Sequence, residues 1–193
     1  VADADMSVAA CQVMALRAAR NIGVQVPVST VERAVEYVRR SAVRPEDPQW
    51  SFQMGNRPGS FRYQPQFNSR ATFALTAAGI TILHGAGLYA DADIDRGLNR
   101  LEEELVQFTR RYGNAEGGHY FFYYGHYYAV QAFHIAGGAR YRSYLDIVQR
   151  ELLRMQAVDG SFPNRIGPGA AYGTATACLI LQIPKEYLPI FQR

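Results

Sequence analysis

Residues 69–83 read SRATFALTAAGITIL, and residues 93–111 read DIDRGLNRLEEELVQFTRR. The first stretch is small and apolar on nearly every side, which predicts a helix that is buried on most sides. The second stretch places Ile94, Leu98, Leu101, Leu105 and Phe108 in line, with charged residues between them, as in an amphipathic outer helix. The alternation of these two helix types predicts an all-α fold.

Both helix types recur along the chain. Further inner helices are expected over residues 6–22, 120–136 and 171–181, and further amphipathic helices over 29–41 and 141–156. Gly23, Gly87 and Gly137 follow inner helices and supply helix stops. Residues 44–67 are rich in Pro, Gly and aromatic residues, so a loop or a short hairpin is expected there.

The loops recur as well. Gly-Ser-Phe occurs at residues 59–61 and again at 160–162, and Gly-Gly-His-Tyr stands at 117–120. This repetition predicts one domain over residues 1–193, with repeats of roughly 1–66, 67–117, 118–163 and a partial 164–193. A helical hairpin cannot bury its own apolar surface, so neighbouring repeats must stack into a curved layer.

Several local predictions follow from residue types. Ser29 and Glu32 have the spacing of a capping box, with Val31, Ala34, Val35 and Val38 facing inward after it. Asp3 and Asp5 precede the first helix and are interpreted as caps. His84 and His134 lie near helix ends, where a protonated imidazole bonds end carbonyls. Cys11 and Cys178 lie in apolar helical stretches and are expected to be buried free thiols.

Composition argues against several classes of function. The net charge is +3 and the arginines are scattered over many helices, so no nucleic-acid partner is expected. No apolar run is long enough for a transmembrane helix. No Gly-rich phosphate loop, serine nucleophile motif or metal-ligand spacing is present, so neither a cofactor nor a metal is expected.

Several strings resemble a known family. Residues 152–162, Leu-Leu-Arg-Met-Gln-Ala-Val-Asp-Gly-Ser-Phe, resemble the QW motif of squalene–hopene cyclases, with Phe162 where Trp is usual. Residues 59–65, Gly-Ser-Phe-Arg-Tyr-Gln-Pro, are similar to a turn of the prenyltransferase and squalene-oxidase repeat family. Residues 124–132, 172–175, 181–184 and 187–190 resemble strings of a little-characterised bacterial branch of that family.

The resemblance implies an α/α toroid, here an incomplete ring that forms the C-terminal part of a longer repeat protein. It also implies a protein that is often exported in bacteria. Squalene–hopene cyclases use an Asp-rich acid motif, and the nearest match is Asp91-Ala92-Asp93-Ile94-Asp95. Because that string starts an amphipathic helix, it is interpreted as a cap that complements the helix dipole.

The most unusual stretch is HYFFYYGHYYAVQAFH at residues 119–134. An inner helix there would turn phenol rings and imidazoles toward a cavity, where they could stabilise a cation, stack on sugars or hold an apolar chain. Packing between helices is the alternative for most of these tyrosines. His126, next to Gly125, is the candidate general acid or base. The candidate ligand-binding residues are Tyr63, Tyr120, Tyr123, Tyr124, Tyr127 and His134.

Three functions are consistent with this pattern. The first is binding of an extended apolar or isoprenoid ligand in an aromatic cavity, with or without catalysis. The second is a non-enzymatic repeat scaffold that binds a partner protein or further repeats. The third is a carbohydrate-binding or carbohydrate-active toroid, which for hydrolysis would need a pair of inward carboxylates that the predicted inner helices lack.

Overall fold

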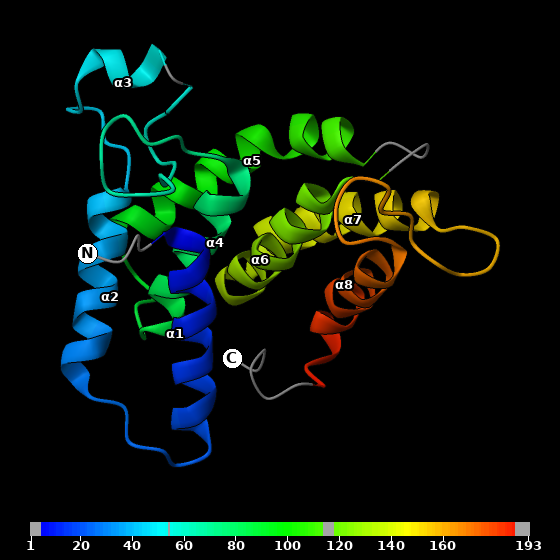
Figure 1. The fold of residues 1–193 in the computed structure, drawn as a ribbon, viewed down its shortest axis with the longest axis horizontal. Coiled ribbons are helices and arrows are strands. Elements are labelled where there is room, and N and C mark those ends of the chain that lie inside the picture. The colour runs from blue at the N-terminus through cyan, green and yellow to red at the C-terminus, as the bar shows by residue number, and fades with distance from the viewer. Residues whose placement is uncertain (1–4, 54, 114–117, 188–193) are drawn as a thin grey trace. The chain divides into compact units, whose positions relative to one another are not determined.

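The computed structural model describes residues 5–53, 55–113 and 118–187 (Figure 1). Within them the protein is all-α, with eight α-helices, one 3-10 helix and no β-strand. The helices are α1 (Met6–Asn21), α2 (Val28–Ser41), α3 (Gln49–Gln53), α4 (Phe73–Gly85), α5 (Ala92–Tyr112), α6 (Tyr120–Ala136), α7 (Gly138–Met155) and α8 (Ala170–Gln182), followed by η1 (Ile183–Lys185).

The expected helix ranges are therefore close to the observed ones. The expected loop at 44–67 contains the short helix α3, and isolated backbone bridges join Ala42 to Phe61 and Arg62 to Ala71. The chain divides into two compact units, Val1–Leu101 and Glu102–Arg193, which we call unit 1 and unit 2. The division into one domain of four repeats stays a prediction.

Each unit is built around one central helix. In unit 1, α4 packs against α1 and α2, and every residue from Phe73 to His84 is buried. In unit 2, α6 packs against α7, α8 and η1, and it buries most of its length. Both central helices carry apolar or aromatic residues on most sides, as expected of helices that neighbours cover from several sides.

The repeated Gly-Ser-Phe tripeptide has the same structure in both units. Gly59 and Gly160 have φ angles of +89° and +84°, a backbone conformation that glycine adopts without strain. Phe61 and Phe162 are both buried. The backbone N–H of Phe61 donates to Thr76 Oγ1 at 3.1 Å, and that of Phe162 donates to Thr174 Oγ1 at 3.0 Å. In each unit a hydroxyl of the following helix thus fixes the loop.

Some local predictions are confirmed. Asp5 caps α1, because its Oδ1 accepts the backbone N–H of Val8 at 2.9 Å. Asp91 Oδ1 accepts the N–H of Asp93 at 2.8 Å and so caps the start of α5. Asp3 lies outside the described residues.

Other local predictions are wrong. Helix α2 begins at Val28, after Pro27, without a side-chain cap, so Ser29 is not its N-cap. The terminal helices are less buried than expected, since α1 fully buries Met6, Ala10 and Val13 alone. Cys11 and Cys178 are exposed and not buried.

Of the two helix-end histidines, His84 differs from expectation, whereas the expectation for His134 stays a prediction. Burial lowers the pKa of His84 to about 4, so its imidazole is neutral near pH 7 and does not bond end carbonyls as a cation. His134 is buried, and its Nε2 lies 3.1 Å from Glu186 Oε1.

Candidate functional site

His126 lies in the closed interior of unit 2. Its side chain is fully buried; Nδ1 lies 3.0 Å from the Tyr144 hydroxyl and Nε2 lies 3.3 Å from Thr109 Oγ1. The rings of Phe108 and Phe122 pack edge-on against the imidazole. Desolvation lowers the pKa of His126 to about 3, so the ring is neutral near pH 7. This arrangement joins α5, α6 and α7 through polar contacts within the core.

The candidate tyrosines of α6 pack against neighbouring side chains. Tyr123 is buried and donates its hydroxyl to the Pro163 carbonyl at 2.6 Å, and burial raises its pKa to about 12. Tyr120 stacks on His119, with ring centroids 5.0 Å apart. Tyr124 and Tyr127 are half-buried and each packs against the ring of Tyr128.

Tyr63 belongs to unit 1, where it is 42% exposed and its hydroxyl donates to Asp5 at 2.7 Å. The predicted site residues therefore divide between the two units, with His126 and the other five in unit 2. Their role as a catalytic or ligand-binding set stays a prediction. They form aromatic clusters within a helical protein.

A groove of about 760 Å³ runs along α2 in unit 1. Val28, Val31 and Val35 form an apolar strip on α2, and Ala86 and Leu88, which follow α4, face it across the groove. This strip differs from the expected inward face, because Val38 is fully buried whereas Val31 and Val35 are half-buried and Val28 is 71% exposed. The remaining lining residues are Glu32, Glu36, Arg39, Arg40, Ala42, Arg44, Asp47, Arg62 and Phe67.

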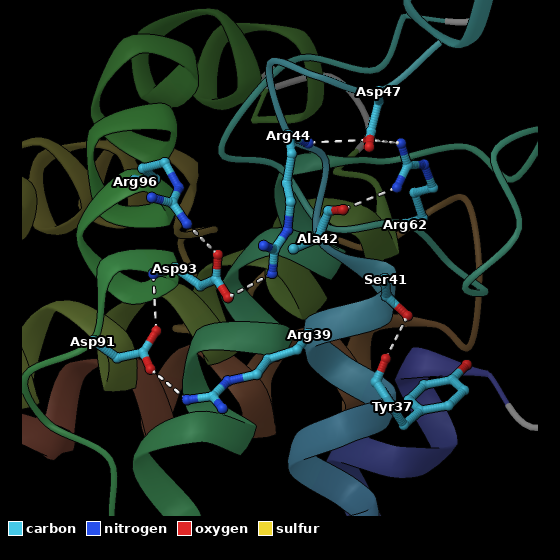
Figure 2. Close-up of polar contacts among 10 residues, drawn as sticks. All are labelled: Tyr37, Arg39, Ser41, Ala42, Arg44, Asp47, Arg62, Asp91, Asp93 and Arg96. Atoms are coloured by element: carbon cyan, nitrogen blue, oxygen red, sulfur yellow. Dashed lines mark hydrogen bonds and ion pairs between the residues drawn. The ribbon is translucent and has the colours of Figure 1, made fainter.

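Ion pairs close the basic end of the groove (Figure 2). Arg39 pairs with Asp91 at 2.8 Å, and the buried Asp93 pairs with Arg44 at 3.4 Å and Arg96 at 2.5 Å. Although partial burial alone would raise it, hydrogen bonds from Arg39 and from backbone amides lower the pKa of Asp91. These contacts link the end of α2 to the start of α5 within unit 1.

Arg62 stabilises the same end of the groove. Its side chain is 1% exposed, donates to the Ala42 carbonyl at 2.9 Å and pairs with Asp47. The guanidinium also lies over the ring of Phe67, 5.2 Å from its centroid. The buried arginine thus holds Phe67, which is 44% exposed, at the mouth of the groove.

Sequence reasoning missed this groove, although its residues carried a signal. The sequence pattern predicts that the Asp91–Asp95 string caps a helix, and of Asp91 and Asp93 only Asp91 does so. Asp93 is a buried ion-pair partner and does not line the groove. The signal is α2 itself, whose valines at positions 28, 31, 35 and 38 share one face, of which only Val38 is fully buried.

Two further observations bear on the kind of site. Among the described residues, no cluster of three or more His, Cys, Asp or Glu side chains is placed to ligate a metal ion. None of the described helices combines the length and apolar character that spanning a membrane requires.

Comparisons with protein-family models, with curated proteins and with solved structures gave no match.

Proposed function

We propose that this chain is a helical-repeat binding module whose binding surface is the α2 groove, and that its ligand is an amphipathic helix of a protein. The observation that carries the proposal is the strip of Val28, Val31 and Val35, which α2 exposes where an amphipathic helix normally buries its apolar face. Valines at these spacings match the i, i+3, i+7 anchors of helix-in-groove recognition.

The rims of the groove favour a protein ligand. Glu32 and Glu36 flank the valines toward the start of α2, and Arg39 and Arg40 flank them toward its end. Charges of both signs beside an apolar strip match a helix that carries its own charged flanks. An isoprenoid chain has no polar groups for these rims, and the open groove would leave one side of the chain in water.

The toroid belongs to the same proposal. The matched Gly-Ser-Phe loops and their threonine contacts in the two units support a repeated hairpin layer, as the family resemblance implies. In such layers, the surfaces that neighbouring hairpins leave uncovered serve for recognition. We therefore propose that the uncovered surface along α2 binds the ligand. We assign no catalytic step to any group in the groove.

Selection from a displayed library of 16-residue amphipathic peptides tests this function. We expect the selected peptides to bind wild-type protein in fluorescence anisotropy and to lose about tenfold or more in affinity to Val35→Lys, because a buried cation is costly. Leu153→Lys is the matched control, since Leu153 is 63% exposed on α7.

Binding of a fluorescent farnesyl probe distinguishes an apolar small-molecule ligand from a protein ligand. Saturable binding of the probe that Val35→Lys abolishes, together with no selected peptide, would contradict the protein-binding function and favour an apolar small molecule. Peptides that bind Val35→Lys and wild type equally would contradict the groove as the binding surface.

A further inference from the structure

We infer that one ligand of this groove is α2 of a second copy of this chain, which docks antiparallel to the first about a two-fold axis close to Val35. The inference rests on the proposed function, because it names the helix that the groove binds. It follows from the charges and apolar residues at the two ends of the groove.

The charges of the groove are self-complementary. Glu32 and Arg40 both line it, both are exposed, and neither has an ion pair among the described residues. They lie about 12 Å apart along the axis of α2, at about 1.5 Å per residue, so they cannot pair with each other. In an antiparallel pair, Glu32 of each copy faces Arg40 of the other copy, so this ion pair forms twice.

The axis then passes close to the apolar strip. The midpoint between positions 32 and 40 is position 36, one residue from Val35, so the half-buried Val35 side chains of the two copies lie beside the axis. Glu36 lies at the axis, opposite Glu36 of the other copy, and each Glu36 is one helical turn from Arg40 of the other copy, whose long side chain can offset the like charges. An isologous contact of this kind closes on itself and gives a dimer.

The two ends of the groove carry different apolar groups that complement one another. At the start of α2, Val28 is shared between the groove and a second hollow that Val24 also lines, and both valines are more than half exposed. At the other end, Trp50 and Phe67 are 50% and 44% exposed and pack edge to face.

Figure 1 shows the connection before α2 at one end of that helix and α3, which carries Trp50, at the other. Antiparallel docking therefore lays the valines of each copy against the aromatic pair of the other. Aromatic residues are enriched in protein interfaces, and Trp is among the most frequent anchors.

Sedimentation equilibrium with charge-swapped variants tests the inference. We expect the wild-type chain to dimerise, and Glu32→Arg and Arg40→Glu each to weaken the dimer by about tenfold or more, because each places like charges opposite one another. An equimolar mixture of the two variants should regain the wild-type association, since the new positive charge at position 32 faces the new negative charge at position 40. The double variant should also regain it.

The control is Arg165→Glu, an exposed residue of unit 2, which should not alter association. A wild-type chain that stays monomeric at the highest concentrations reached, or variants that fail to complement in the mixture, would overturn the inference. If a library-selected peptide still binds the groove of such a monomer in a Val35-dependent way, the second-copy inference fails and the proposed function stands. If the chain neither dimerises nor binds a selected peptide, the second-copy inference and the proposed function are both overturned.

Discussion

The amphipathic helices α2 and α7 have similar sequence patterns, yet their apolar faces are buried to different extents. Helix α7 packs on α6 and fully buries Tyr144, Val148, Leu152 and Met155. Helix α2 packs on α4 and α1 but fully buries Val38 and Ser41 alone. An amphipathic period therefore shows that a helix has a face to cover, and not whether its own chain covers that face.

The two central helices differ in a related way. Around α6, unit 2 is closed by aromatic rings and by the His126 contacts with Thr109 and Tyr144. Around α4, unit 1 is closed by small and aliphatic residues, and a groove remains along α2. We therefore assign structural stability to the His126 cluster and binding to the α2 groove.

The largest expected effect is on the core of unit 2. Phe122 is fully buried against His126 and Tyr123. Phe122→Ala should lower the free energy of unfolding by about 3–5 kcal/mol, because it leaves a cavity in a packed core. Denaturant titration measures this, and Leu153→Ala, at a position of α7 that is 63% exposed, is the control. A loss below about 1 kcal/mol would contradict a closed core in unit 2.

The repeated loop contact gives the next effect. Thr76→Val and Thr174→Val each leave the N–H of a buried loop phenylalanine without its acceptor, which costs about 1–3 kcal/mol. Similar losses from the two variants in thermal or denaturant unfolding would sharpen the equivalence of the two loops. If one variant leaves the free energy of unfolding unchanged, different contacts stabilise the two loops.

Acid should destabilise both units through their buried histidines. The pKa values of His84 and His126 in the folded protein, about 4 and about 3, lie below the ordinary value of 6.5. The unfolded chain therefore binds more protons than the folded protein between these values, and stability falls as the pH drops below 6.5.

For His126 the expected loss between pH 7 and pH 5.5 is about 1 kcal/mol. His126→Asn removes this group, so its unfolding free energy should depend less on pH over that interval than that of the wild type. Equal pH dependence of the two proteins would show that His126 titrates normally in the folded state.

The smallest effect on stability is expected in the groove itself. Val35→Lys changes a half-buried position at an open surface, so it should shift the free energy of unfolding by no more than about 0.5 kcal/mol. Circular dichroism during denaturant titration measures the shift. A loss as large as that of Phe122→Ala would show that Val35 belongs to the core and not to a binding surface.

Much of the fold follows from the sequence. The period of apolar residues and the glycine stops predicted the seven longer helices within a few residues, because both signals are local. The repeated Gly-Ser-Phe loops were recognisable for the same reason. What the sequence did not predict depends on neighbours. Cys11 and Cys178 lie in apolar helical stretches and are nevertheless exposed.

In the candidate site, too, local features follow from the sequence whereas contacts between distant residues do not. The Tyr-rich stretch predicted an inner helix correctly, but the packing of its rings follows from contacts with distant residues such as Pro163 and Tyr144. The groove combines α2 with residues after α4 and with a loop that Arg62 and Asp47 hold in place. No local pattern specifies such a combination.

Disulfide trapping at Val35 tests most directly whether α2 presents its apolar face to another helix. Cys11 and Cys178, both exposed, are first replaced by serine so that position 35 carries the sole thiol. Under mild oxidation we expect Val35→Cys to form a disulfide-linked dimer, because position 35 lies beside the two-fold axis, and Val106→Cys, at an exposed position of α5, to stay monomeric. If position 35 crosslinks no faster than position 106, the antiparallel α2 pair is contradicted.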